Sequence, residues 1–376
     1  MKEGWTYKKF ADCIDKVPKQ KQVKSKDYQP FGKYPIVSQE KELISGYWDD
    51  ERYLYRHKKP VVVFGDHTKE IKYIDFDFIV GADGTQILSP KDGIDAKFFY
   101  YALLATPIRT LGYARHFKLL KEKSFIIPPL FDQLSIVSRL DAAFANIDAL
   151  KTNVERQLAE ARKLFQAELA ECMRPKEGWE EKMLGEVCDI FGRIGFRGYT
   201  TKDLVASPQD GAISLSPTNI QNGAMDYSKL TYISWFKYEE SPEIKIYNGD
   251  ILLVKTGSSY GKSALVENLP HEATINPQSV VLKNFKIDNR FFAYQLRTNV
   301  IKEEFDKFVS GTAIPTFSQA KLSSVPIYYP SEKIQHQIVA RLDALSAHIR
   351  QLEEVQRKTL AECDALKQAM LGEVFE

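Results

Sequence analysis

The segment SFIIPPLFDQLSIVSRLDAAFANIDAL (Ser124–Leu150) has a second copy in the chain, PIYYPSEKIQHQIVARLDALSAHIRQL (Pro326–Leu352). The two copies lie 202 residues apart, so that Gln133 aligns with Gln335 and Asp141 aligns with Asp343. The tetrapeptide KEGW also occurs twice, near the start of the chain and again just after the first copy. An internal repeat of this kind indicates two structural units built on one plan.

Both copies have the apolar spacing of a long helix. Apolar residues recur every three or four positions over about 35–40 residues, without Gly or Pro. At about 1.5 Å per residue, each helix is roughly 50–60 Å long and outruns a compact domain. We therefore expect the two helices to pair with one another or with helices of a partner. The predicted contact positions are Ile136, Leu140, Ile147, Leu150, Val154, Ile338, Leu342, Ile349 and Leu352.

The stretches between the repeats differ from each other and are rich in short β-type runs. In each stretch, apolar runs cut by Gly, Pro and Asp precede one helical segment, KFFYYALLATPIRTL in the first and RFFAYQLRTNVIKEEFDKF in the second. The predicted fold is α+β, with two pseudo-repeated α+β domains alternating with two long helices. The predicted boundaries are 1–131 and 176–331 for the domains, and 132–175 and 332–376 for the helices.

Composition limits the possible classes of function. The 376 residues carry a net charge of +2, although residues 1–131 hold 23 Lys and Arg against 17 Asp and Glu. The basic first domain is suited to a polyanion. No apolar run approaches the ~20 residues of a membrane span, and the start lacks the apolar stretch of a signal peptide. With four scattered cysteines as well, we expect a cytoplasmic protein without a membrane or metal site.

A glycine-rich loop in the second domain raises the question of ATP binding. The run DILLVKTGSSYGKSALV at residues 250–266 resembles a phosphate-binding loop, but Gly257 and Gly261 enclose one residue too few. Pro270 also leaves no room for the helix that should follow the loop. The sequence therefore favours a hairpin between two strands.

Catalytic motifs are weak. The set Asp226, Glu243 and Lys245 fits a metal-dependent nuclease only loosely, because Pro242 suits a central strand poorly. The run NPQS at residues 276–279 departs from the Asn-Pro-Pro-aromatic motif of adenine methyltransferases. We therefore expect a protein without catalytic residues.

Several motifs resemble one known family. These are W-x₄-LGEVCD at residues 179–189, SPTNIQNG at 216–223, NGDILLVKTGSSYGKSALV at 248–266 and SGTAIPTFSQAKLSSVPIYYP at 310–330. Together with the duplicated helix, they are similar to the specificity subunit of type I restriction-modification systems. One departure is Ile334, which stands where the family commonly has an acidic residue before the glutamine.

The resemblance implies a division of labour between subunits. Each α+β domain would be a target-recognition domain for one half of a split double-stranded DNA sequence. The two long helices would pair as an antiparallel coiled coil, set the gap between the half-sites and dock the modification subunits. The methyltransferase subunits would use S-adenosylmethionine, and the restriction/translocase subunits would use ATP and Mg, so that this chain would hold no cofactor.

Candidate DNA contacts follow from residue type and from placement on predicted loops. In the first domain they are Lys21, Lys24, Lys26, His57, Lys58, Lys59, Arg115 and His116. In the second domain they are Arg193, Arg197, Tyr199, Lys255, Ser258, Ser259, Tyr260, Lys262, Ser310 and Thr312, with the first three on a glycine-rich loop expected to expose them. The alternatives are a coiled-coil scaffold and a stand-alone DNA-binding protein without a restriction role.

Overall fold

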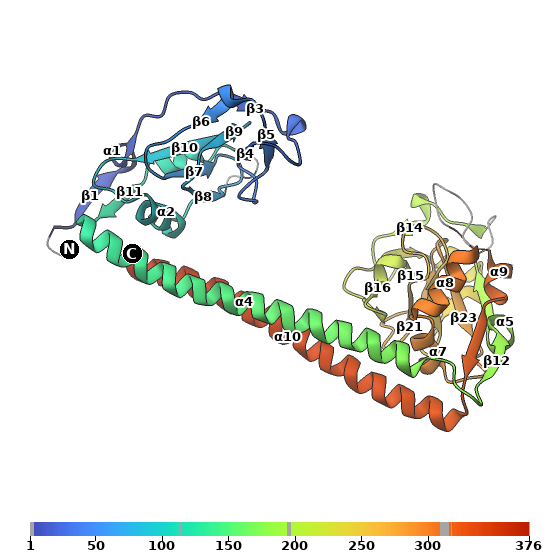
Figure 1. Cartoon of the computed structure of the whole chain (residues 1–376). Coiled ribbons are helices and arrows are strands. Elements are labelled where there is room, and N and C mark those ends of the chain that lie inside the picture. Colours follow the sequence, from blue (N-terminus) through green and yellow to red (C-terminus); the bar gives the residue numbers. More distant parts are fainter. Residues whose placement is uncertain are drawn as a thin grey trace. The chain divides into compact units, whose positions relative to one another are not determined.

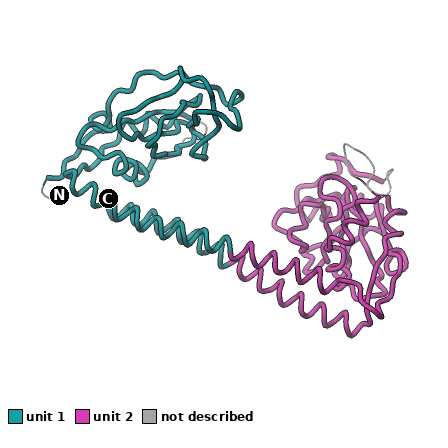
Figure 2. Tube along the Cα trace, viewed as in Figure 1, with its two compact units in different colours: residues 1–156, 355–376 teal, residues 157–354 magenta. Residues whose placement is uncertain are grey.

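The computed structural model describes residues 4–110, 112, 114–193, 197–308, 316 and 318–375. The chain divides into two compact units, residues 1–156 with 355–376 (unit 1) and residues 157–354 (unit 2) (Figure 2). Each unit contains one α+β domain and a part of both long helices. These helices are α4 (Leu130–Cys172) and α10 (Glu332–Phe375) (Figure 1).

The two long helices pair in antiparallel fashion, as predicted. Within each unit, early residues of one helix meet late residues of the other. Leu140 and Leu371 share one buried cluster in unit 1, and Leu169 and Leu342 share another in unit 2. Ion pairs flank these apolar contacts, with N–O distances of 2.5 Å for Lys151–Asp364, 2.6 Å for Lys367–Asp148, 2.7 Å for Arg162–Glu353 and 2.7 Å for Arg341–Glu168.

The domain of unit 1 contains two larger sheets and a short pair of strands. The first sheet has the order β2-β10-β7-β8, and its central strand β7 is buried along its whole length, as its VVVFG sequence predicts. The second sheet has the order β3-β9-β4-β5, with β6 also on β9, and β9 runs parallel to both β3 and β4. The strands are β1 (Thr6–Lys9), β2 (Ile14–Asp15), β3 (Gln22–Val23), β4 (Tyr34–Val37), β5 (Gly46–Trp48), β6 (Leu54–Tyr55), β7 (Val61–Gly65), β8 (Ile71–Ile74), β9 (Phe78–Gly81), β10 (Thr85–Pro90) and β11 (Ser124–Ile127).

Short helices complete this domain. The main one is α2 (Ala96–Ala105), which the first helical segment of the sequence predicts. Its N-terminus is capped by the Asp95 carboxylate, which accepts hydrogen bonds from the backbone N–H groups of Lys97 and Phe98 at 3.0 and 2.8 Å. The others are α1 (Phe10–Cys13), α3 (Phe117–Lys121), η1 (Ser25–Asp27) and η2 (Glu51–Tyr53).

The domain of unit 2 repeats this plan with more strands. The order β13-β23-β20-β21 repeats the first sheet of unit 1, and β14-β18-β15-β22-β19 repeats the parallel pairing in the second, through β15 and β22. The strands are β12 (Glu180–Met183), β13 (Asp189–Gly192), β14 (Leu204–Val205), β15 (Gly211–Leu215), β16 (Ile220–Gln221), β17 (Ala224–Met225), β18 (Tyr232–Ser234), β19 (Lys245–Ile246), β20 (Ile251–Val254), β21 (Ser263–Leu265), β22 (Ala273–Ile275), β23 (Ser279–Lys283) and β24 (Pro326–Tyr329).

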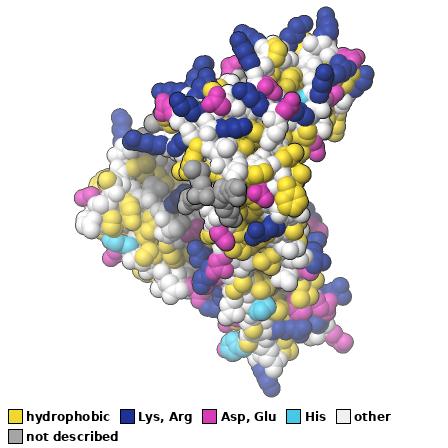
Figure 3. Space-filling model, turned by 90° about the vertical axis from the view of Figure 1, so that its left-hand side faces the viewer, with side chains coloured by type: hydrophobic (Ala, Val, Ile, Leu, Met, Phe, Trp, Pro, Cys, Tyr) yellow, Lys and Arg dark blue, Asp and Glu magenta, His cyan; other side chains and the backbone are white. Residues whose placement is uncertain are grey.

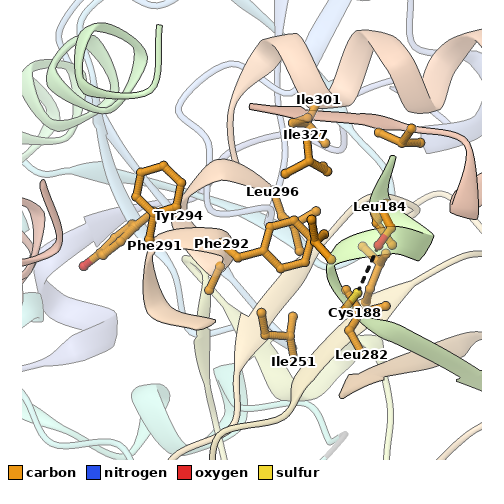
Figure 4. Close-up of a cluster of buried hydrophobic side chains, with 14 of the residues drawn as sticks. Leu184, Cys188, Ile251, Leu282, Phe291, Phe292, Tyr294, Leu296, Ile301 and Ile327 are labelled. Carbon is orange, nitrogen blue, oxygen red and sulfur yellow. Dashed lines mark hydrogen bonds between the residues drawn. The ribbon is translucent and has the colours of Figure 1, made fainter. Parts of the chain in front are cut away.

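The core of unit 2 joins its first sheet to its helices. Figure 4 shows Phe292 and Leu296 from the helical segment facing Ile251 of β20 and Leu282 of β23. On the other side, Leu184 of α5 lies in the same buried cluster. The helices of this domain are α5 (Leu184–Val187), α6 (Trp235–Glu239), α7 (Asn289–Gln295), α8 (Asn299–Phe308) and α9 (Gln319–Ser323), with η4 (Thr201–Asp203), η5 (Pro217–Asn219) and η6 (Pro242–Ile244).

The second predicted helical segment is broken in two, which the sequence pattern did not predict. Helix α7 ends at Gln295 and α8 begins at Asn299. Between them, the hydroxyl of Thr298 donates to the Gln295 carbonyl at 2.8 Å. Arg297 donates to the Asn222 carbonyl at 3.0 Å, and its guanidinium lies 5.5 Å from the ring centre of Tyr294. These local contacts stabilise a corner where the sequence pattern continues as a helix.

A buried glutamine at the start of each long helix ties that helix to its domain. Gln133 is fully buried; its Oε1 accepts the backbone N–H of Asp95 at 2.8 Å, and its Nε2 donates to the carbonyls of Gly93 and Pro128. In unit 2, Oε1 of Gln335 accepts the backbone N–H of Asp288 at 2.9 Å, and its Nε2 donates to a proline carbonyl. The glutamine common to both repeats therefore binds the residue that caps α2 or α7.

An aspartate two turns further along each helix makes a second connection. Asp141 accepts hydrogen bonds from the Tyr101 hydroxyl and, at 2.8 Å, from Lys97 Nζ. Burial and the Asp141 carboxylate raise the pKa of Tyr101, so that the phenol remains a donor. In unit 2, Asp343 accepts from the Tyr294 hydroxyl at 2.7 Å and from an arginine at 2.9 Å. We call Gln133 and Asp141, with Asp95, Lys97 and Tyr101, the unit 1 anchor, and Gln335 and Asp343, with Asp288, Arg290 and Tyr294, the unit 2 anchor.

We predict that Gln133→Ala lowers the free energy of unfolding of unit 1 by about 2 kcal/mol, because it leaves a buried N–H and two carbonyls without partners. Hydrogen exchange of the α2 amides measures the change. The control is Gln368→Ala, at an exposed glutamine on α10 in the same unit, which should leave the exchange unchanged. Equal exchange in both variants would contradict the role of the anchor.

Candidate nucleic-acid interface

The lysines on the first loop segment of unit 1 are on the surface. Lys21 and Lys24 flank the short strand β3, Lys26 follows in η1, and all three side chains are exposed. Buried Val23 holds β3 in the domain, and Lys21 Nζ lies 5.5 Å from the centre of the Tyr53 ring. Their contact with DNA stays a prediction, but their placement permits it.

The candidates His57, Lys58 and Lys59 lie shortly after β6 and differ in their surroundings. His57 places Nδ1 at 2.7 Å from the Lys59 carbonyl and Nε2 at 2.9 Å from the Phe76 carbonyl, so both ring nitrogens face the backbone. Lys59 Nζ binds Asp92 at 3.0 Å and Asp15 at 3.4 Å. Lys58 is exposed, and of these three it is the one whose side chain has the most room to meet a phosphate.

The structure corrects the prediction for His116. Its side chain is only 1% exposed, and Nδ1 lies 3.1 Å from the Asp66 carbonyl. The Asp66 carboxylate in turn accepts the backbone N–H of Phe117 at 2.8 Å. His116 therefore fixes the start of α3 inside the domain, whereas its neighbour Arg115 is exposed.

The structure also corrects the expectation that the glycine-rich loop of unit 2 exposes Arg193. This residue is 7% exposed, and its guanidinium donates to the Ile275 carbonyl at 3.1 Å and to the Arg197 carbonyl at 3.2 Å. It also lies 5.2 Å from the centre of the Tyr199 ring. Arg193 thus binds β22 and Arg197 from inside the domain, because a buried guanidinium requires acceptors from the protein itself.

Arg197 and Tyr199 are partly buried around this arginine. Arg197 pairs with Glu243 at 3.4 Å, and the Tyr199 hydroxyl is 2.7 Å from the Ser214 hydroxyl. Both side chains therefore make contacts inside unit 2. Their contact with DNA stays a prediction.

The loop with the Gly-Lys-Ser sequence is a hairpin, as predicted. Strands β20 and β21 pair antiparallel, and the N–H of Gly261 donates to the Val254 carbonyl at 2.8 Å. Gly261 has a φ of +81°, a conformation that favours glycine. A strand follows the loop where a phosphate-binding loop would begin a helix.

The hairpin offers some polar groups to solvent and uses others internally. Ser258 and Lys262 are exposed, whereas Ser259 is partly buried and the Tyr260 hydroxyl donates to Asp306. Lys255 is half-buried at the end of β20, and burial lowers the pKa of its ammonium group. The remaining two candidates of this unit, Ser310 and Thr312, lie outside the described residues.

The predicted contact positions on α4 and α10 differ in how exposed they are. Leu140, Ile147 and Leu342 are 2%, 7% and 0% exposed, so their side chains pack within this chain, as expected if the helices pair with one another, and are not available to another subunit. Leu150 is 47% exposed. Ile136, Val154, Ile338, Ile349 and Leu352 are partly buried.

The surface of unit 1 adds two residues that the sequence analysis missed. Lys33 is exposed, and Phe31 is 84% exposed on the same turn. Figure 3 shows Lys and Arg side chains gathered over unit 1, at the top of that view, with apolar side chains among them. The signal in the sequence was the run QPFGK at residues 29–33, in which Pro and Gly flank an aromatic residue beside a lysine.

Comparison with known proteins identifies the class. A family model for the type I restriction modification DNA specificity domain matches residues 2–160 and again residues 176–362. These matches cover most of the chain, which therefore belongs to this family, the specificity subunits of type I restriction-modification systems.

Individual proteins similar to this chain are specificity subunits of the same family. The chain is 26% identical over 338 residues to the EcoR124I/EcoR124II specificity subunit of Escherichia coli, covering 85% of this chain and 81% of that subunit. It is 22% identical over 303 residues to the EcoKI specificity subunit of Escherichia coli K12, covering 75% of this chain. The match spans 64% of the EcoKI subunit, which is less than two thirds of its length.

Solved structures share the fold. A chain from a study of complex assembly and conformational transition of the type I R-M system superposes with a TM-score of 0.69 at 17% identity, covering 98% of this chain and 97% of that one. The HsdS subunit from Thermoanaerobacter tengcongensis gives a TM-score of 0.52 at 18% identity, covering 100% and 97%. In the part of this chain that the structure describes, no helix is long and apolar enough to cross a membrane.

The position of Arg193 gives a prediction that separates folding from DNA contact. Arg193→Ala should lower the free energy of unfolding of unit 2 by about 2 kcal/mol, because the carbonyls it binds lose a charged donor. Hydrogen exchange of β15 and β22 measures the effect. Lys202→Ala, at an exposed lysine of the same unit, is the control and should change nothing. If Arg193→Ala weakens DNA binding but leaves the hydrogen exchange of β15 and β22 unchanged, Arg193 is instead a DNA contact.

Proposed function

We propose that this specificity subunit reads a bipartite target in double-stranded DNA, each α+β domain contacting one half. The observation that carries the proposal is the repeated anchor, which attaches two different domains to the same pair of helices through matching residues. We call the two long helices with their two anchors the frame. A duplicated frame that carries two divergent domains suits two half-sites of different sequence. The helices would set the gap between them, as dimer spacing does in other DNA readers.

The exposed residues support contact with the DNA backbone first. Lys21, Lys24 and Lys26 in unit 1, and Lys262 in unit 2, are flexible cations on the surface, suited to phosphates. Because such contacts release counterions, binding should weaken steeply as salt is raised. Bases would be read by polar and apolar side chains on the same loops.

The helices also support docking of other subunits. Leu164 on α4 and Leu366 on α10 occupy equivalent positions of the repeat, and they are 63% and 51% exposed. Apolar side chains exposed at matching repeat positions are suited to two copies of one partner. We infer that these partners are modification subunits, which would bind S-adenosylmethionine and methylate adenine. Restriction/translocase subunits would bring ATP and Mg, and this chain would contribute recognition without catalysis.

Methylation mapping tests the proposal. The chain is expressed with the modification subunit encoded beside it, assembly is checked by co-purification, and plasmid DNA is sequenced for modified adenines. We predict a split motif with a fixed gap. An assembled complex that methylates no DNA, or that methylates one uninterrupted motif, would contradict a bipartite reader.

A further inference from the structure

Phe31 is the most exposed large apolar side chain in the described part of the chain, at 84%. It lies between η1 and β4. A single exposed apolar residue needs no special explanation in general. The turn that carries this ring, however, is tied down on both sides.

Hydrogen bonds fix the turn against β5. On one side, Gln29 and Tyr47 exchange backbone hydrogen bonds of 3.2 and 2.9 Å. On the other, the backbone N–H of Lys33 donates to the Asp49 carboxylate at 2.7 Å. Between these ties, a Cβ added to Gly32 would lie 2.9 Å from the Cβ of Tyr47, so only glycine allows so close an approach. The ring of Phe31 is therefore held outward by a supported backbone.

The segment that carries the ring is basic. The segment from residue 19 to residue 33 contains five lysines and one acidic residue, Asp27. Acidic groups on the neighbouring elements are already engaged: Asp49 holds the turn, Asp50 pairs with Arg52 at 2.6 Å, and Glu51 pairs with Arg56. An apolar ring on a supported turn, within a segment that holds five lysines, is suited to a ligand with anionic groups outside and apolar, stackable groups inside. A nucleic acid duplex is such a ligand.

We infer that Phe31 is the apolar DNA contact of unit 1 and inserts at a base step of the half-site that this unit reads. The lysines of the same segment would hold the phosphates on either side while the ring partly unstacks the step, as apolar wedges do in other DNA-binding proteins. Base steps differ in how easily they unstack, so the contact contributes to specificity. The inference rests on the proposed function and assigns one residue within it.

The test uses the complex with the modification subunit and duplexes carrying the mapped target. Phe31→Ala should weaken binding about tenfold, while the slope of log K against log salt stays unchanged because no charge is lost. The double variant Lys24→Ala/Lys26→Ala should instead make that slope shallower by up to about 1.8. Phe31→Tyr, which keeps the ring, should restore affinity.

Two further measurements connect the effect to the half-site of unit 1. With 2-aminopurine placed in that half-site, the wild-type complex should raise the fluorescence on binding, and Phe31→Ala should not. Phe31→Ala should also reduce discrimination against base substitutions in the same half-site. Phe236→Ala, at a ring that is 75% exposed in unit 2, is the matched control and should leave this discrimination unchanged.

Unchanged affinity, fluorescence and discrimination in Phe31→Ala would overturn the inference and show a solvent-exposed ring with no DNA role. That result leaves the proposed function standing, since the wild-type complex still binds its split target. If the wild-type complex binds no split target at all, the proposed function fails first and the inference fails with it.

Discussion

The hydrogen bonds that Gln133 and Gln335 make inside the two units are the constraint on which the rest of the structure depends. Both side chains are buried, at 0% and 4% exposure, and a buried amide is stable only with its partners in place. Each glutamine binds the backbone at the start of α2 or α7, and the aspartate two turns later binds a tyrosine of that helix. Because these groups must meet together, each domain is attached to its long helix in one way.

Because of this attachment, the anchor residues must stay constant, whereas the loops outside the anchors are free to vary. The anchors use the runs DAKFFYY at residues 95–101 and DNRFFAY at residues 288–294, in which the cap, the cation and the tyrosine keep the same spacing. The loops that carry Lys24, Phe31 and Lys262 lie outside these runs. An attachment that does not depend on these loops is consistent with the proposed reading of two different half-sites.

The sequence allowed the frame to be predicted better than the interface. The α+β class and the two long helices follow from the internal repeat and from periodicity, which report burial directly. The hairpin at residues 250–266 follows from the glycine spacing of the loop and from Pro270. The antiparallel pairing was implied by the resemblance to the family. The corner between α7 and α8 did not follow, because Thr298 and Arg297 stabilise it through contacts that periodicity does not record.

The individual DNA contacts were harder to predict for a related reason. Residue type suggested that His116 and Arg193 face DNA, yet both are buried and bind backbone carbonyls of their own domains. Phe31 was missed because an apolar side chain is normally assigned to the core. Its exposure depends on a turn that Tyr47 and Asp49 support, and these two residues meet the turn only in the fold.

The central claim is that the anchored frame is independent of what each domain reads. The most direct measurement replaces residues 6–123 with the corresponding domain of another specificity subunit that keeps the capping aspartate, the cation and the tyrosine, and then maps DNA methylation. The account predicts that one half of the target changes while the other half and the gap stay the same. A change in both halves, from a complex shown to assemble, would contradict it.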